Sequence, residues 1–244
     1  MEAMASESGE TAVRRLIKSQ VEDQKLLAER WAQITDAALD CFERHGFHAT
    51  TIKDIARRAG FSNGLIYHYV ENKQDVLVLV ILEIFRSYRR EIPRALTGVS
   101  DPLERLCVVA VAYCNVVASR IDASLLAYQE TKALDEERQR LIKNLELETN
   151  ELIAECVRAC AEAGYLELGG DAGEIELATY RIVMMAHSWA LKGWRFKDVV
   201  SFERYVADSL AFVMRGLLSA KGRRHYEGAL GHSLSAAECR SAST

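Results

Sequence analysis

The run of residues 49–76 constrains the fold of this chain more than any other part of the sequence. It opens with Thr51 and places Asp54 three residues later, which is the capping-box pattern that starts a helix. Apolar residues then recur at helical spacing, and Gly60 supplies the residue type that ends a helix in the left-handed conformation. The run therefore begins with a short helix that closes at a tight turn.

A second short helix is predicted over residues 63–69, with Ser62 as its cap. Its outward positions hold small or hydrogen-bonding groups instead of the mixture of Glu and Lys that covers an ordinary solvated helix. These positions are Asn63, Gly64, Tyr67 and His68. A helix of this kind suits contact with phosphates and base edges, so the two helices are interpreted as a helix-turn-helix that binds DNA.

A family resemblance rests on signature positions spread over residues 37–73. They are Ala37-Ala38, Phe42, Gly46-Phe47, Thr50-Thr51-Ile52, Ile55-Ala56, Ala59-Gly60-Phe61-Ser62, Gly64-Leu65-Ile66-Tyr67-His68-Tyr69 and Lys73. At these positions the chain resembles the N-terminal domain of TetR-family transcriptional regulators. Val70 departs from the usual aromatic residue, and Asn63 stands where many members carry a basic one. The rest of the chain resembles the family in its helix pattern.

Phosphate contacts are predicted for Thr51 and Tyr67, because helix N-termini and tyrosine hydroxyls meet backbone oxygens. Lys73 is expected to reach a phosphate as a point charge, and His68 to touch a phosphate or a base. From Arg44 to Lys73 there are five basic and two acidic side chains in a chain of net charge −4, which indicates a local patch facing phosphates.

Base readout is predicted for the start of the second helix. Asn63 can make a bidentate contact to adenine, Leu65 can meet a thymine methyl, and Gly64 lets the backbone come close. The alternative for each of these residues is an ordinary solvent-exposed helix position.

Composition and breaker residues favour an all-α protein. The resemblance implies that an N-terminal helix-turn-helix domain precedes a helical ligand-binding and dimerisation domain. Hydrophobic residues make up 49% of the chain and only two prolines occur. The predicted parts are an N-terminal extension (1–28), the DNA-binding domain (29–72), a connecting helix (73–97), the ligand-binding and dimerisation domain (101–220) and a loose tail (221–244). Within them, helices are expected over 27–45, 73–94, 103–119, about 123–134, 136–163, 174–192 and about 201–220.

The N-terminal extension carries apolar residues at roughly helical spacing over 11–28, with basic residues among them. Two interpretations stay open: a basic arm that reaches the flank of the DNA, or else an amphipathic helix packed on the body or a partly frayed leader. A secretory signal is not apparent and no run approaches 18 uninterrupted apolar residues, so we expect a cytoplasmic protein that does not enter the membrane. Six cysteines fit free thiols in a reducing compartment.

The candidate effector pocket draws on aromatic, sulfur-bearing and polar positions of the helical body. They are Tyr113, Val117, Leu125, Tyr128, Gln129, Met184, His187 and Trp189. Helix bundles build ligand cavities from such facing positions. The alternative is that these residues are ordinary core.

Catalysis and cofactor binding are not expected. The sequence contains no phosphate-binding glycine loop, no His-Glu-x-x-His and no nucleophile elbow. Cys156 and Cys160 are one helical turn apart, a spacing that suits two metal ligands, but further ligands are not evident and buried thiols are the favoured interpretation.

The resemblance implies a homodimer in which helices 174–192 and 201–220 form the interface. Its two recognition helices would meet successive major grooves of a palindromic operator in double-stranded DNA. A small hydrophobic effector would release this repressor, and the segments 128–132 and 187–192 resemble those of members linked to acyl-CoA and aromatic-acid catabolism. The expected effector is therefore an acyl- or aroyl-CoA thioester or another hydrophobic organic acid. The alternatives are a ligand-independent activator or nucleoid-associated factor, or an enzyme fused to a DNA-binding head. The sequence does not identify the operator, the regulated genes or the individual effector.

Overall fold

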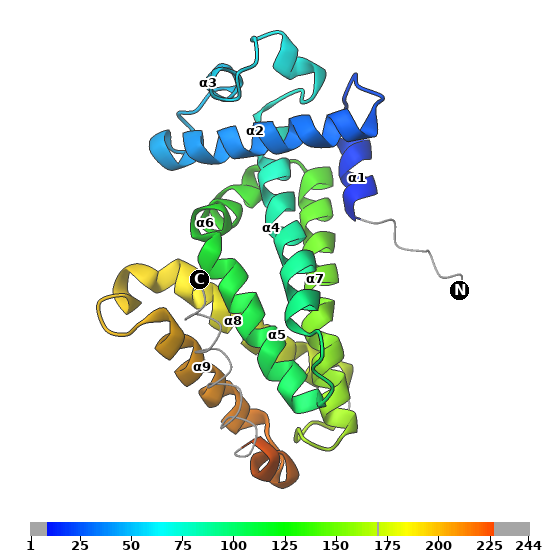
Figure 1. Cartoon of the computed structure of the whole chain (residues 1–244), viewed down its shortest axis with the longest axis vertical. Helices are drawn as coiled ribbons and strands as arrows, with labels where there is room; N and C mark the ends of the chain where they lie inside the picture. Colours follow the sequence, from blue (N-terminus) through cyan, green and yellow to red (C-terminus); the bar gives the residue numbers. More distant parts are fainter. Residues whose placement is uncertain (1–8, 170, 227–244) are drawn as a thin grey trace. The chain divides into compact units, whose positions relative to one another are not determined.

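The structure is a computed structural model that describes residues 9–169 and 171–226 (Figure 1). The regular elements of these residues are helices, which confirms the predicted all-α class. An isolated antiparallel β-bridge joins Leu166 and Leu218. The elements are α1 (Gly9–Leu16), α2 (Gln24–His45), α3 (Ile52–Arg58), the 3-10 helix η1 (Leu65–His68), α4 (Lys73–Ala95), α5 (Pro102–Ser119), α6 (Ile121–Glu130), η2 (Thr131–Ala133), α7 (Glu136–Glu162), α8 (Ala172–Phe196) and α9 (Phe202–Leu217).

The chain folds into two compact units that share two helices. Unit 1 contains the chain as far as Ser87 together with Arg120–Leu147, and unit 2 contains Tyr88–Ser119 together with the chain from Glu148 onward. Helices α4 and α7 are therefore each divided between the units. This division differs from the sequence-based domain boundaries, because α6 and the first half of α7 pack with the predicted DNA-binding domain.

Local capping explains where the helices of unit 1 begin and end. The amide of Asp54 donates to Thr51 Oγ1 over 3.2 Å, and Asp54 Oδ2 accepts from the Thr51 amide over 3.1 Å, which is the predicted capping box. Gly46 and Gly60 follow α2 and α3 with φ of 76° and 74°, a conformation that favours glycine. Asn72 caps α4 by accepting from the Asp75 amide over 3.0 Å.

The second helix of the helix-turn-helix is shorter and tighter than predicted: residues 63–69 were expected to form a helix, and a 3-10 helix spans Leu65–His68. The amide of its C-cap residue, Tyr69, donates three residues back to the carbonyl of Ile66 over 3.0 Å, which is the spacing of a 3-10 helix. The carbonyls at its end are taken by other parts of unit 1, because Trp31 Nε1 donates to the Tyr69 oxygen over 3.0 Å. That competition for the carbonyls explains why a regular α-helix does not continue here.

The first half of α4 is the core of unit 1. Every residue from Val76 to Leu82 is at most 1% exposed, so this stretch is covered on all sides, as its continuous apolar sequence predicted. In Figure 1, α2 lies between this half of α4 and the segment that carries α3 and η1. Trp31 and Ile34 of α2 are buried in this unit.

In unit 2, α5 packs against α8 and α9, and these two helices pack on each other. Helix α5 is the one described helix that is long and apolar enough, by length and composition, to cross a membrane. Its inward residues, among them Leu103, Leu106 and Val109, are fully buried in unit 2. The apolar sequence of α5 is therefore explained by its place as the core helix of a helical domain.

The ends of the chain differ from expectation. Helix α1 ends at Leu16, so the extension is not one helix over 11–28, because Asp23 starts α2 by accepting from the amides of Lys25 and Leu26. Residues 221–226 were expected in a loose tail, but they are helical, and Tyr226 is buried. His225 anchors this turn through a 2.9 Å contact to Asp101. The rest of the predicted tail, 227–244, lies outside the described residues.

Candidate functional site

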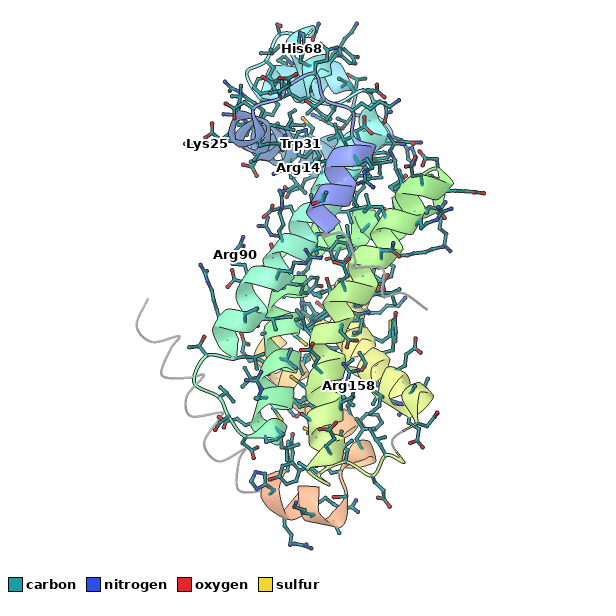
Figure 2. The ribbon with its side chains drawn as sticks, turned by 90° about the vertical axis from the view of Figure 1, so that its right-hand side faces the viewer. Arg14, Lys25, Trp31, His68, Arg90 and Arg158 are labelled. Atoms are coloured by element: carbon teal, nitrogen blue, oxygen red, sulfur yellow. The ribbon has the colours of Figure 1, made fainter. Side chains whose placement is uncertain are left out.

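The candidate DNA-binding surface is the outward side of η1 and the turn before it. Asn63, Gly64 and His68 are exposed there, and Leu65 and Tyr67 are 39% and 45% exposed although both carry large apolar groups. On the inward side, Ile66 is fully buried. The segment thus combines an anchored inner side with an outer side of small, apolar and hydrogen-bonding groups. Figure 2 shows the labelled His68 at the outer edge of unit 1.

Three residues that sequence reasoning did not select hold η1 in place. The backbone amide of Gln20 and the hydroxyl of Ser19 both donate to the carbonyl oxygen of His68, over 2.9 and 3.0 Å. The Trp31 indole holds the next carbonyl. No periodicity or spacing identifies such contacts, because the partners lie tens of residues apart in the sequence.

The N-terminal extension is attached to unit 1 by its apolar residues. Val13 and Ile17 are fully buried, and Arg14 is hydrogen-bonded to Gln24 of α2. In both figures α1 lies on the side of α2 away from η1. The loop that follows α1 reaches residues 63–68, which form the recognition segment. These contacts favour the packed interpretation of the extension over a basic arm reaching the DNA flank.

Thr51 and Lys73, both predicted phosphate ligands, have protein partners. The Thr51 hydroxyl donates to Asp54 Oδ2 over 2.6 Å. Lys73 Nζ donates to the carbonyl oxygens of Phe47, His48 and Thr50 over 2.8, 3.1 and 3.0 Å, and lies 4.5 Å from the centre of the Phe47 ring. An ammonium group has three donors, so the three carbonyls occupy all of them. Lys73 therefore ties the turn between α2 and α3 to the start of α4.

The positive patch predicted between Arg44 and Lys73 is largely neutralised by ion pairs. Arg44 and Arg58 both bind Asp40, and the hydrogen bond from Arg58 is the main reason that the pKa of Asp40 lies below its usual value. Arg57 binds Asp54 over 2.6 Å. Lys53, exposed on α3, has no ion pair among the described residues, and Lys73 binds carbonyl oxygens instead of a carboxylate.

Two further contacts tie the predicted DNA-binding domain to α6 and α7 within unit 1. His48 Nε2 lies 3.2 Å from Glu130 Oε1, and Glu130 is buried at the end of α6. Arg138 of α7 binds the fully buried carboxylate of Asp75, which also accepts from the amides of Glu71 and Asn72. The turn before α3 and the start of α4 are thus each bonded to a helix of the other predicted domain.

The predicted effector residues are divided between the two units. In unit 2, Tyr113 and His187 meet, with Tyr113 Oη 3.1 Å from His187 Nε2, and Val117 is fully buried on the same helix as Tyr113. Trp189 is buried in an aromatic cluster with Phe196, Phe202 and Tyr205, which joins α8 to α9. In unit 1, Leu125 is partly exposed, and Tyr128 and Gln129 are exposed on α6.

Met184 belongs to a different surface. It is 45% exposed on α8, on a helix pair whose large apolar side chains reach solvent. The most exposed are Trp194 and Phe212, at 73% and 79%. Large apolar side chains exposed to this degree on one helix pair indicate an interaction surface. The others on α8, α9 and the segment between them are Leu177, Leu191 and Val199.

The cysteines on α7 are buried thiols. Burial raises the pKa of both Cys156 and Cys160, and the Cys160 thiol donates to the carbonyl of Pro102 over 3.0 Å. Among the residues that the structure describes, no three His, Cys, Asp or Glu side chains are grouped as metal ligands.

Both halves of the chain match models of known protein families. Residues 34–80 match the family described as bacterial regulatory proteins, tetR family, and residues 99–192 match a tetracyclin repressor-like C-terminal domain. The HTH-type transcriptional regulator HbdR of Aromatoleum sp. (strain CIB) is 42% identical over 207 residues, which is 85% of this chain and 89% of the relative.

Solved structures share the fold. A tetR-family regulatory protein from Rhodococcus RHA1 superposes with a TM-score of 0.67 at 22% identity, covering 78% of this chain and 98% of the other. The transcriptional regulator FadR of Bacillus subtilis, crystallised in complex with stearoyl-CoA, gives 0.65 at 19% identity and covers 76% and 98%.

Proposed function

Because this chain belongs to the TetR family of bacterial regulatory proteins, we propose that it is a cytoplasmic repressor that a CoA thioester releases from a palindromic operator. It is a DNA-binding transcriptional regulator of the helix-turn-helix type. The observation that carries the proposal is the recognition segment, whose buried Ile66 and capped carbonyls fix an outward row of Asn63, Leu65 and Tyr67. Rigid placement of such a row is what reading a DNA groove requires.

Base reading is assigned to Asn63 and Leu65, with Gly64 giving close approach, and phosphate contact to Tyr67 and His68. Asn63→Ala should change which operator is preferred, because it removes a side chain that can bond two atoms of one base. Tyr67→Phe should weaken binding to all sequences alike, because a phosphate contact carries no base information. If Asn63→Ala leaves the operator preference as it was, the base-reading assignment is wrong.

Dimerisation is assigned to α8 and α9. Their exposed apolar side chains, led by Trp194 and Phe212, suit a self-complementary surface in a two-fold dimer. Such a dimer presents two recognition segments to the two half-sites of a palindrome.

The effector is assigned to the interior of unit 2. Support comes from the FadR of Bacillus subtilis, a structural neighbour that was crystallised with stearoyl-CoA. The buried contact between Tyr113 and His187 provides polar groups within the apolar interior of that unit. Units 1 and 2 share α4 and α7, which gives an effector in unit 2 a covalent path to the DNA-binding unit. A tenfold release needs a preference of about 1.4 kcal/mol for the state that does not bind DNA.

The test is a mobility-shift titration at fixed salt on the DNA upstream of the protein's own gene, repeated with acyl- and aroyl-CoA thioesters. Dissociation by one thioester at micromolar concentration would support both halves of the proposal. Sequence-specific binding that no thioester relieves would reject the effector class. Hydrolysis of a bound thioester would instead favour an enzyme fused to a DNA-binding head.

A further inference from the structure

A polar cluster lies in the interior of unit 2, with one side chain from each of four helices. Tyr88 comes from α4, Tyr113 from α5, Asn150 from α7 and His187 from α8. The two tyrosine rings stack with 4.3 Å between their centres, and Tyr113 Oη lies 3.4 Å from Asn150 Oδ1 and 3.1 Å from His187 Nε2. Tyr88, Tyr113 and Asn150 are at most 4% exposed.

The side-chain amide of Asn150 has an unused hydrogen-bond donor in this cluster. The Tyr113 hydroxyl donates to Asn150 Oδ1 over 3.4 Å, and the same hydroxyl lies within hydrogen-bonding distance of His187 Nε2, at 3.1 Å. Asn150 Nδ2 is buried and has no hydrogen-bond partner among the described residues. A buried amide without an acceptor destabilises a folded protein, so such a group in a native interior requires an explanation.

Resting on the proposed function, we propose that Asn150 recognises the effector, its amide N–H donating to an uncharged oxygen of the acyl part of a CoA thioester. The acceptor is either the thioester carbonyl or a hydroxyl carried by the acyl group. Both oxygens are uncharged hydrogen-bond acceptors. An uncharged acceptor can satisfy the buried amide donor without bringing a charge into the apolar interior.

The charge of the cluster excludes a free carboxylate as the preferred ligand. Asn150 and the tyrosines are uncharged at neutral pH, and burial lowers the pKa of His187 to about 4, so its imidazole is neutral as well. Arg89, which follows Tyr88 on α4, is bound to Glu148. A carboxylate placed here would lose its hydration without gaining a countercharge, which costs free energy. The thioester of the same acid carries no charge at that position and avoids this cost. The site therefore distinguishes an activated acid from the free acid.

The experiment compares wild-type protein with Asn150→Leu by calorimetric titration and thermal unfolding. The probes are benzoyl-CoA and octanoyl-CoA, their thioether analogues S-benzyl-CoA and S-octyl-CoA, a ring-hydroxylated benzoyl-CoA, and the free acids. Asn144→Leu is the matched control, because Asn144 is exposed on the same helix. Wild-type protein should bind the thioesters and not the free acids.

Asn150→Leu should raise the Kd of the thioester at least about tenfold, since one buried hydrogen bond is lost. It should change the Tm of the unliganded protein little, because the substitution removes the unsatisfied Nδ2 donor together with the Oδ1 that accepts from Tyr113. A merely structural Asn150 would behave in the opposite way, with a lower Tm and an unchanged Kd, and that outcome would overturn the proposal. Asn144→Leu should change neither quantity.

The two sources of the oxygen are separated by the analogues. If the thioester carbonyl is the acceptor, the thioether binds wild-type protein about tenfold more weakly than the thioester, and Asn150→Leu abolishes that difference. If an acyl hydroxyl is the acceptor, Asn150→Leu instead abolishes the advantage of the hydroxylated benzoyl-CoA over benzoyl-CoA. Binding by wild-type protein is measured first: a wild type that binds no thioester rejects the proposed function and this inference with it. A responsive wild type and an equally responsive Asn150→Leu reject the inference alone.

Discussion

Replacing Lys73 by methionine tests whether this side chain serves the protein or the DNA. The sequence predicted a phosphate ligand, whereas the structure places Nζ on the carbonyls of Phe47, His48 and Thr50. Lys73→Met keeps most of the aliphatic stem and removes only the charged donor. It therefore separates packing from hydrogen bonding.

The expected cost follows from those contacts. A hydrogen bond to a charged group contributes roughly 1.5–3 kcal/mol when it stands alone. The three bonds of one ammonium are not additive, and Lys73 is partly exposed, so water can replace some of them. The contact with the Phe47 ring adds about 0.5 kcal/mol. We expect a loss of about 2 kcal/mol and a fall in Tm of about 5 °C for a chain of this size.

The assay combines thermal unfolding with the salt dependence of operator binding. A lysine that contacts a phosphate contributes about 0.9 to the slope of log K against log salt concentration, and its removal lowers the slope by that amount. A structural lysine leaves the slope unchanged while weakening binding, because the turn before α3 loses its support. Lys53→Met is the matched control for the loss of one charge, and it should leave Tm within about 1 °C since Lys53 is exposed. An unchanged Tm together with a slope reduced by about 0.9 in Lys73→Met would refute the structural assignment.

Three further changes are expected. Burial lowers the pKa of His187 from 6.5 to about 4, so between these pH values the unfolded chain binds a proton that the folded chain does not. The free energy of unfolding should therefore fall by up to about 3 kcal/mol as the pH drops from 6.5 to 4. Denaturation at several pH values should show this loss, and His187→Gln should flatten it. Arg138→Met should lower the free energy of unfolding by about 3 kcal/mol, because the fully buried carboxylate of Asp75 loses its counterion. Adding Asp75→Asn to the same chain should restore part of the lost stability, and denaturation of the single and double variants measures both effects. Phe212→Asp should shift the protein towards monomer in light scattering and weaken operator binding, with Glu203→Asp, an exposed and conservative change on the same helix, as the control.

Signals between near neighbours in the chain made most of the fold predictable. The capping box at Thr51 and the glycines after α2 and α3 act over three or four residues, and they set the helix boundaries where predicted. The end of η1 depends instead on Ser19, Gln20 and Trp31, which no local pattern connects with it. The 3-10 form was therefore beyond the reach of sequence reasoning.

The candidate sites were less predictable, because residue type does not determine a partner. The ammonium of Lys73 suits a phosphate and a carbonyl equally well, and only the fold shows three carbonyls around it. Helical spacing identified the apolar stripes of α8 without telling which face meets solvent, so Met184 and Trp189 were placed together. Asn150 carried no signal at all, since one polar residue on a long charged helix becomes informative only when it proves to be buried.

The bonds inside unit 1 constrain how an effector can release the DNA. Lys73 and Glu130 hold the turn before α3, and Arg138 holds the start of α4, so distorting the recognition segment from behind would break several charged contacts at once. At roughly 1–3 kcal/mol each, the contacts of Lys73 and Arg138 together exceed the 1.4 kcal/mol that a tenfold release requires. Moving unit 1 as one body keeps them intact and therefore costs the effector less binding energy. We expect amide exchange over residues 46–51 to be equally slow with and without a releasing thioester. Faster exchange at that turn on ligand binding would instead show that release proceeds by loosening the helix-turn-helix itself.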